Sequence, residues 1–224
     1  MMKVIVFNGS PAAGRSATHV MAKAFLRGAA RAGAEVEEIF LAEHTVCQCH
    51  GCFACWFSTP GRCVKQDDMA ALLARYQQSD IVCFGTPVYT WNMTALLKNF
   101  VDRLVPLKAP RIVAEAGRFD LADAKARQQR FVVLANCGFP GENNFDVLRQ
   151  AMASCHPALE IYRSCGKLLV SHQPQARARV DAWLPAVERA GWELVRDGAV
   201  TPATVDALAA PLMSDEEYIA FLGM

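Results

Sequence analysis

The stretch that decides the fold is residues 3–16, KVIVFNGSPAAGRS. Its first part, Lys3–Phe7, is a short β-branched run that predicts a buried parallel strand. Asn-Gly-Ser-Pro ends this run, and apolar residues then recur with helical spacing from Ser16 to Gly33, which indicates a helix lying on a sheet. A strand, a loop and a helix in this order are typical of the first unit of an α/β fold.

The alternation of strand and helix continues along the chain. Further strands are expected at residues 36–41, 80–85, 131–136 and 159–170, and helices near residues 69–78, 94–105, 144–154 and 175–197. Five strands alternating with helices predict an open, doubly wound parallel sheet, in which ligands bind at the carboxyl ends of the strands. The candidate functional loops are therefore residues 8–18, 86–93 and 136–143.

Two segments interrupt this alternation. Residues 42–66 are cysteine-rich and irregular, whereas residues 106–129 are mostly polar with a weak helical pattern at DLADAKARQQ, residues 120–129. We interpret the second segment as a connecting excursion. Residues 201–224 carry a proline in a helix-start position and a later capping-box spacing. They predict a helical tail that packs on the domain of residues 1–200 or on a partner subunit.

The composition narrows the class of protein. Hydrophobic residues make up 53% of the 224 residues, charged residues make up 20%, and the formal net charge is +1. This balance gives no electrostatic reason to bind nucleic acid or an acidic membrane surface. The sequence shows no apolar run of roughly 18 residues, which a transmembrane helix needs, and its opening apolar stretch is too short for a signal peptide. We therefore expect a cytoplasmic protein without a nucleic-acid or membrane partner.

The loop GSPAAGRS, residues 9–16, has three interpretations. A nucleoside-triphosphate loop needs a lysine where this chain has Arg15, and an acidic metal ligand that the strands at 80–85 and 131–136 do not supply at their ends. A dinucleotide loop needs G-x-G-x-x-G, which this stretch lacks. The third interpretation is a loop for a monophosphate, held by hydroxyl groups and by the free N–H groups at the start of a helix. The candidate residues for it are Ser10, Ser16 and Thr18, and Arg15 is either a phosphate clamp or a charge on the helix surface. The alternative is that Ser16 only caps the helix.

Five motifs in order carry a family resemblance. They are FNGSP, CHGCFACW, GRCVKQDDM, FGTPVYTWNMTALLKNFVDRL and the glycine-containing loop after the fourth strand. Together they resemble the NADPH-dependent FMN reductase family, whose relatives include iron–sulfur flavoproteins. The resemblance covers about residues 3–140. It implies a flavodoxin-like fold, with a five-stranded doubly wound parallel sheet flanked by helices.

The resemblance also implies an activity. It indicates an FMN-dependent oxidoreductase, a homodimer or homotetramer, that takes hydride from NAD(P)H and reduces a quinone, a free flavin or another small acceptor. Hydride then passes directly between nicotinamide and flavin, and the protein supplies position and electronics. No Ser/His/Asp or paired-carboxylate constellation stands out in the sequence, so no catalytic residue is expected.

By the same resemblance, the TPVYTWN loop holds the isoalloxazine ring of FMN. Pro87 and Val88 would stiffen a turn, Tyr89 and Trp91 offer flat surfaces, and their neighbours Thr90 and Asn92 add hydrogen-bonding groups. Gly138 in the third loop would let the backbone approach the ring. The implied FMN-binding residues are Ser10, Arg15, Ser16, Thr18, Pro87, Val88, Tyr89, Thr90, Trp91, Asn92, Asn136, Cys137 and Gly138.

The cysteines form a separate motif. Nine are present, and the spacing Cys49-x₂-Cys52-x₂-Cys55-x₇-Cys63 is the one that ligates a [4Fe–4S] cluster in the iron–sulfur flavoproteins that this chain resembles. A four-cysteine zinc site would normally use two well-separated pairs. Cluster-free members of the family carry similar cysteines, and the loop then serves as an interface or a pocket wall. The alternative function is therefore an electron-transfer flavoprotein with FMN, a [4Fe–4S] cluster and a protein redox partner.

Overall fold

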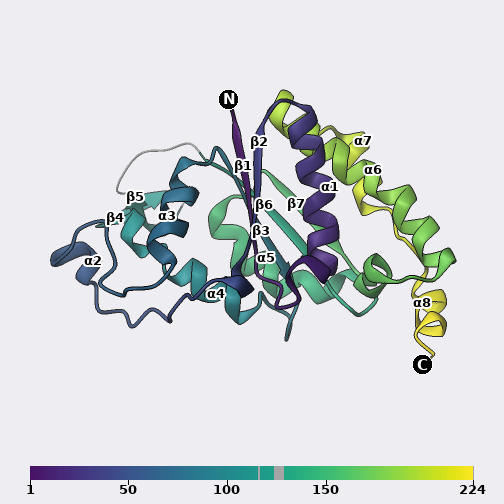
Figure 1. Ribbon diagram of the computed structural model, residues 1–224, viewed down its shortest axis with the longest axis horizontal. Helices are drawn as coiled ribbons and strands as arrows, with labels where there is room; N and C mark the ends of the chain where they lie inside the picture. Colours follow the sequence, from purple (N-terminus) through teal and green to yellow (C-terminus); the bar gives the residue numbers. More distant parts are fainter. Residues whose placement is uncertain (116, 124–128, 224) are drawn as a thin grey trace.

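The central feature of the fold is one parallel sheet. The computed structural model describes residues 1–115, 117–123 and 129–223. Within this part of the chain, five parallel strands pair in the order β2-β1-β3-β6-β7 (Figure 1). They are β1 (Lys3–Asn8), β2 (Glu35–Phe40), β3 (Ile81–Pro87), β6 (Arg130–Asn136) and β7 (Leu159–Arg163). This order confirms the predicted doubly wound, flavodoxin-like sheet.

The alternation of side chains along the strands divides the core into two layers. On β1, Val4 and Val6 face the layer that contains α1 (Ala17–Arg31) and α6 (Pro174–Arg196). Ile5 and Phe7 face the opposite layer, because successive residues of a strand point to opposite faces. That layer is formed by α3 (Met69–Gln78), α4 (Ala95–Asp102) and α5 (Asp146–Met152), as Figure 1 shows. Both faces of the sheet are thus covered, as a parallel sheet requires.

Helices α1 and α6 approach so closely that their backbones touch. A Cβ atom added to Gly28 on α1 would lie 1.7 Å from the carbonyl oxygen of Glu188. A Cβ atom added to Gly191 on α6 would lie 2.1 Å from the carbonyl oxygen of Phe25. Only glycine fits at either position, since real Cβ contacts are never this short. The two helices therefore form a rigid layer behind the sheet.

The segment between the third and fourth sheet strands differs from its prediction. It contains an antiparallel hairpin of β4 (Lys108–Glu115) and β5 (Arg118–Asp123). The predicted helical pattern at residues 120–129 is wrong for residues 120–123, and residues 124–128 lie outside the described part. Ile112 on β4 pairs with Leu121 on β5. The conformation of this stretch is therefore decided by pairing with a neighbouring strand.

The last strand is also shorter than predicted. β7 ends at Arg163, and Cys165 then adopts a left-handed conformation with φ of 56°. The chain turns there into η6 (Gly166–Val170), a 3₁₀ helix. The apolar run of residues 159–170 therefore covers two elements, because periodicity alone does not show where a short buried strand stops.

Several short helices and a C-terminal pair complete the structure. The short helices are η1 (Ala13–Arg15), η2 (Leu41–Glu43), α2 (Ala54–Phe57), η3 (Val105–Leu107), η4 (Glu142–Phe145) and η5 (Ala153–Cys155), and the C-terminal pair is α7 (Pro202–Ala209) and α8 (Asp215–Phe221). Ser214 and Glu217 form the capping box predicted for the last helix. The carboxylate of Glu193 on α6 accepts from Thr201 N at 2.9 Å and from the hydroxyl of Thr204 at 2.9 Å. These bonds hold the start of α7 on the domain.

None of the helices in the described residues combines the length and the apolar character that spanning a bilayer demands.

Candidate functional site

Three loops meet at the carboxyl edge of the sheet because β1, β3 and β6 are neighbouring strands. Gly9 N donates to the carbonyl oxygen of Gly85 at 2.7 Å, and Val88 N donates to that of Asn136 at 2.7 Å. These two bonds tie the loop after β1 to the end of β3, and the loop after β3 to the end of β6. The three loops that the sequence predicts to be functional are therefore one continuous surface.

The loop after β1 is shaped by its own side chains. Asn8 Oδ1 accepts from Ser10 N at 2.9 Å, which makes a tight turn. Ser16 is the N-cap of α1: its hydroxyl accepts from His19 N at 3.0 Å and donates to the carbonyl oxygen of Ala13 at 2.7 Å. The Ser16 hydroxyl thus donates one hydrogen bond and accepts another within the loop and the helix start. This is the helix-capping role that the sequence offers as the alternative to phosphate binding.

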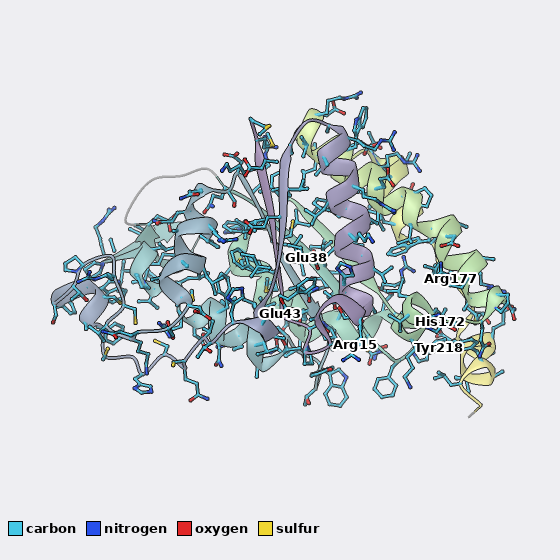
Figure 2. The ribbon with its side chains drawn as sticks, viewed as in Figure 1. Arg15, Glu38, Glu43, His172, Arg177 and Tyr218 are labelled. Carbon is cyan, nitrogen blue, oxygen red and sulfur yellow. The ribbon has the colours of Figure 1, made fainter. Side chains whose placement is uncertain are left out.

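Some donors of this loop remain without an acceptor among the described residues. The Ser10 hydroxyl accepts from Ala12 N at 3.4 Å but has no acceptor for its own proton there. Ala17 N and Thr18 N occupy the first two positions of α1 and cannot bond within the helix. Arg15 is exposed at the N-terminal end of the helix (Figure 2). A helix N-terminus, a hydroxyl donor and an arginine make this loop a fitting site for an anion.

A buried network that the sequence reasoning missed supports the loop from β2. Glu38 Oε1 accepts from Asn8 Nδ2 at 2.8 Å, and Glu38 Oε2 lies 2.7 Å from His19 Nδ1. The Glu38 side chain is only 10% exposed. The network fixes Asn8, whose other side-chain atom holds Ser10 N. No local pattern reveals it, since Glu38 stands in an ordinary strand and its partners lie on two other elements.

Thr18 lies deeper than its place in the sequence suggests. It is 0% exposed, and its hydroxyl oxygen accepts from Asn136 Nδ2 at 2.8 Å. Asn136 is the last residue of β6 and is 6% exposed. The structure therefore brings these two predicted residues together, as a link between α1 and β6 beneath the loops.

The loop after β3 presents two exposed aromatic rings. Tyr89 N donates to the carbonyl oxygen of Asn92 at 2.9 Å, and Asn92 N donates back at 3.1 Å. Between them Thr90 and Trp91 have φ of 48° and 60°, which is the left-handed region that non-glycine residues seldom adopt. Tyr89 is 53% exposed and Trp91 is 56% exposed. Residues with this kind of backbone strain are often found at functional sites.

Pro87 and Val88 are not part of this turn. Pro87 is the last residue of β3, and Val88 continues the contact with β6 through its N–H group. Thr94, two residues after the turn, caps α4 by accepting from Leu97 N at 3.3 Å. Thr94 also donates to the carbonyl oxygen of Gly9 at 2.7 Å. α4 is thereby attached to the loop after β1.

The loop after β6 contains Cys137, Gly138 and the exposed Phe139. Cys137 is 3% exposed, and burial raises the pKa of its thiol. A Cβ atom added to Gly138 would meet nothing within 4 Å, so the space beside it is open. The hydroxyl of Tyr218, on the last helix, donates to the Gly138 carbonyl oxygen at 2.8 Å. The C-terminal segment thus contacts the candidate site, which the sequence alone does not reveal.

The four cysteines of the predicted cluster lie on the surface loop that leads through α2. Cys49 and Cys52 are exposed, and Cys55 and Cys63 are half-buried. Burial raises the pKa of Cys55, and the nearby thiols of Cys63, Cys49 and Cys52 raise it further. Each of the other three cysteines of the motif thus affects the pKa of Cys55. Within the described ranges, however, no three His, Cys, Asp or Glu side chains are arranged to hold a metal ion.

A buried ion pair attaches this cysteine loop to α4. Arg103 donates to the carbonyl oxygen of Cys47 at 2.7 Å and to both carboxylate oxygens of Asp67, at 2.7 and 3.1 Å. Cys47 N and Met69 N donate to the same carboxylate at 2.9 and 3.1 Å. Burial alone would raise the pKa of Asp67, but these hydrogen bonds and the arginine charge lower it to about 2.

One nitrogen of the Arg103 guanidinium, the buried Nε, has no hydrogen-bond partner among the described residues. Cys63 lies near enough to contribute to the raised pKa of Arg103. A negatively charged sulfur at Cys63 would give the guanidinium a partner of opposite charge. The residues around Cys63 therefore suit a thiolate ligand, although the cysteines of the motif do not form a metal-binding group among the described residues.

A sequence model that describes NADPH-dependent FMN reductases matches residues 2–118, which is more than half of the chain. The chain belongs to this FMN reductase family. The matched region contains the loops after β1 and β3 and the whole cysteine loop. The loop after β6 and the C-terminal helices lie beyond it.

Curated relatives of this FMN reductase family member carry the name iron–sulfur flavoprotein. One from Archaeoglobus fulgidus is 33% identical over 102 residues, which is 46% of this chain and 48% of the relative. One from Methanosarcina thermophila is 32% identical over 107 residues, which is 48% of this chain and 54% of the relative. The chain therefore spans about half the length of the curated relatives it matches.

Solved structures share the fold at low sequence identity. An NAD(P)H:quinone oxidoreductase from Methanothermobacter marburgensis superimposes with a TM-score of 0.61 at 18% identity, covering 86% of this chain and 96% of the other. An FMN-dependent NADH-azoreductase from Bacillus anthracis, solved with FMN, gives 0.60 at 15% identity, covering 87% and 100%. The FMN reductase family member is thus flavodoxin-like in fold over most of its length.

Proposed function

We propose that this protein is an FMN-dependent oxidoreductase that takes hydride from NAD(P)H and reduces a quinone, a free flavin or another small acceptor. The observation that carries the proposal is the joined surface of the loops after β1, β3 and β6. It combines an anion-binding helix start with the exposed rings of Tyr89 and Trp91. Membership of the FMN reductase family supports the same cofactor and electron donor.

The loop after β1 would hold the phosphate of FMN. Ser10 would donate its free hydroxyl proton, Ala17 and Thr18 their N–H groups, and Arg15 a positive charge at the rim. Ser16 would shape the loop through the bonds that occupy its hydroxyl. The site fits a phosphate, because it supplies several hydrogen-bond donors at the start of a helix.

The other two loops would hold the ring. Tyr89 and Trp91 would cover a flat ligand, and the strained turn between them would fix Thr90 and Asn92 beside its edge. Pro87 and Val88 would set the distance between this turn and the loop after β6. FMN, when bound, accepts hydride and passes the electrons on. The chain's own contribution is to position the ring, since no acid or base is required.

The remaining features of the molecule enter the same proposal. We propose a homodimer or homotetramer in the cytoplasm, with Asn136, Cys137 and Gly138 completing the ring site. Free thiols on the exposed cysteine loop are retained in a reducing compartment. The electron acceptor is a small molecule, and neither nucleic acid nor a membrane is needed as a partner.

The variant Ser10→Asp tests the phosphate site. A carboxylate at this position would face the phosphate, and a like-charge pair costs several kcal/mol. We expect FMN affinity, measured by quenching of flavin fluorescence, to fall about 100-fold. The matched control is Ser154→Asp, which adds the same charge at an exposed position on η5. Unchanged FMN affinity in a folded Ser10→Asp protein would remove Ser10 from the phosphate site.

The reductase activity has its own assay. Purified protein with FMN should oxidise NADPH or NADH in the presence of a quinone, as followed by the loss of reduced-nicotinamide absorbance. Protein that binds FMN but oxidises neither nucleotide with any quinone or flavin acceptor would contradict the reductase proposal.

A second candidate function is an electron-transfer flavoprotein with FMN, a [4Fe–4S] cluster and a protein redox partner. It is favoured by the thiols around Cys55 and by the unpartnered Nε of Arg103 near Cys63. The names of the curated relatives support it as well. Cys49, Cys52, Cys55 and Cys63 would hold the cluster after the loop has brought them together.

Iron and sulfide assays on anaerobically purified protein separate the two candidates. Near-stoichiometric iron and sulfide with a broad absorption shoulder supports the carrier, and flavin bands alone support the reductase. Cys52→Ser should abolish the iron content, whereas Cys83→Ser, at a core position on β3, should not. Iron that survives Cys52→Ser would contradict the assignment of the four ligands.

A further inference from the structure

The last helix places a buried tyrosine against the loop after β6. Tyr218 lies on α8 (Figure 2) and is 0% exposed. Its hydroxyl donates to the Gly138 carbonyl oxygen at 2.8 Å. Burial, with smaller contributions from the thiols of Cys165 and Cys137, raises the pKa of Tyr218 to about 12. The hydroxyl therefore stays protonated and remains a donor across the ordinary pH range.

The position of Tyr218 is fixed by contacts at the start of α8. Ser214 and Glu217 form a capping box at its start. Arg179 on α6 donates to the carbonyl oxygen of Leu212 at 2.9 Å and pairs with the Glu217 carboxylate at 3.2 Å. Because these contacts attach α8 to the longest helix of the domain, the tyrosine hydroxyl is held at a defined place relative to the sheet.

The backbone that Tyr218 contacts is held at every carbonyl group. The oxygens of residues 137–139 accept, in order, from Gly166 N at 2.7 Å, from the Tyr218 hydroxyl at 2.8 Å and from Cys165 N at 3.0 Å. The middle bond is the one supplied by a side chain, and it comes from 80 residues away. Without it, the peptide between Gly138 and Phe139 would keep only the contact of Phe139 N with the Cys137 sulfur, at 3.5 Å.

Holding these carbonyl groups also directs the N–H groups. In a trans peptide the N–H and C=O groups point in opposite directions. Phe139 N therefore points away from Tyr218 and lies 3.5 Å from the Cys137 sulfur. Gly138 N points away from Gly166 and has no acceptor among the described residues. The loop thus keeps a free backbone donor at Gly138 and an exposed ring at Phe139.

A second contact joins the C-terminal segment to the same loop. Arg163, at the end of β7, is 2% exposed and donates to the carbonyl oxygens of Leu208 and Ala210 at the end of α7. Trp183 on α6 donates to the Leu208 oxygen at 3.1 Å, and the guanidinium of Arg163 lies 4.4 Å from its ring. The carbonyl oxygen of Arg163 in turn accepts from Cys137 N at 2.9 Å. Two independent routes therefore connect the C-terminal segment to the loop after β6.

We propose that Tyr218 is a positioning residue of the flavin pocket and that the C-terminal segment is a structural part of this site. Its hydroxyl fixes the peptide after Gly138, and through it the free Gly138 N–H group that faces a bound flavin ring. This inference rests on the proposed function, because it assigns the loop after β6 to FMN. It adds a residue that lies outside the region matched by the family.

The test compares Tyr218→Phe with Tyr162→Phe. Tyr162 is a second buried tyrosine, and its hydroxyl donates to Glu160 at 2.7 Å, away from the loop. Each variant loses one hydroxyl hydrogen bond, so both should lose a similar, small amount of stability. In flavin-free protein, amide hydrogen exchange over residues 137–141 should rise about tenfold in Tyr218→Phe and stay within about twofold in Tyr162→Phe.

A second readout concerns the bound cofactor. FMN should bind about fivefold to tenfold more weakly to Tyr218→Phe than to wild type. Its midpoint potential should become more negative, because a fixed N–H donor stabilises the electron-rich reduced ring. Tyr162→Phe should leave both quantities unchanged.

The outcomes distinguish this proposal from the proposed function. FMN binding in wild type with equal loop exchange, affinity and potential in the two variants would overturn the positioning role and leave the function standing. Faster loop exchange in Tyr218→Phe without FMN binding in wild type would overturn the function and reduce Tyr218 to a structural role. Faster exchange together with a shifted potential supports both.

Discussion

The buried ion pair between Arg103 and Asp67 gives the sharpest prediction about stability. Both side chains are 1% exposed. Asp67 accepts from Cys47 N, and Arg103 donates to the carbonyl oxygen of Cys47. Arg103→Met would leave the Asp67 carboxylate buried with two backbone donors but without its cation. Asp67→Asn would leave the buried Arg103 guanidinium without its counter-ion, and one of its nitrogens already lacks a partner among the described residues. Removing one member of a buried pair leaves an uncompensated charge.

The structure sets the expected magnitudes. Losing one partner of a buried pair costs about 3–5 kcal/mol in the free energy of unfolding. Arg103→Met should lie near ~3 kcal/mol, since Cys47 N and Met69 N still solvate the carboxylate. Asp67→Asn should lie near ~4 kcal/mol. The double variant should cost about 4 kcal/mol and not the sum of about 7, because it removes both charges together and leaves a coupling of about 3 kcal/mol.

Urea unfolding followed by circular dichroism measures these values. The matched control is the pair Lys98–Asp102 on α4, whose nitrogen and oxygen lie 2.7 Å apart but whose side chains are 55% and 43% exposed. Lys98→Met and Asp102→Asn should each cost less than about 1 kcal/mol. Additive costs in the double variant, or equal costs at the buried and exposed pairs, would refute the reasoning.

Three further predictions follow from single contacts. Because the pKa of folded Asp67, about 2, lies below its unfolded value, the pair should stabilise the protein above about pH 4, and acid titration should show this stability lost as the pH falls toward about 2. An Arg103→Met protein should lack this loss. Gly191→Ala should lower the thermal midpoint of unfolding although alanine favours helices, since its Cβ would lie 2.1 Å from a carbonyl oxygen. Gly14→Ala should not lower it, because its Cβ would make only an ordinary contact at 3.9 Å. Thr94→Val should cost about 1–2 kcal/mol in urea unfolding and weaken FMN binding, because it removes a helix cap and the bond to Gly9; unchanged FMN affinity would separate that bond from the pocket.

The sequence predicted the arrangement of the functional loops. The alternation of buried strands and amphipathic helices gave the parallel sheet, and the rule that ligands bind at carboxyl edges identified the loops after β1, β3 and β6. These signals are local, since a strand, its turn and the next helix follow one another within about 30 residues. The capping box at Ser214 is equally local and is present in the structure. The assignment of individual residues to FMN stays a prediction.

Local patterns failed where a distant partner decides the conformation. Residues 120–123 have weak helical spacing but form a strand, because the neighbouring strand pairs with them through Lys108, Ile112 and Val113. The DDM motif contains two neighbouring carboxylates, Asp67 and Asp68, whose partners differ. Asp67 accepts hydrogen bonds from Met69 N and from Arg103. Asp68 accepts instead from Thr45 N at 2.7 Å. Only the folded chain brings Arg103 to that position.

The sequence by itself determined the sheet, its helices and the edge at which a ligand would bind, because hydrophobic periodicity and turn residues encode these features over short stretches. Only the tertiary structure decided how that edge is supported. Glu38, Thr94 and Tyr218 each hold a backbone or side-chain group of a loop from another element. Their bonds join residues 30, 85 and 80 positions apart. Such contacts depend on packing the whole chain, so no periodicity in a single stretch can reveal them.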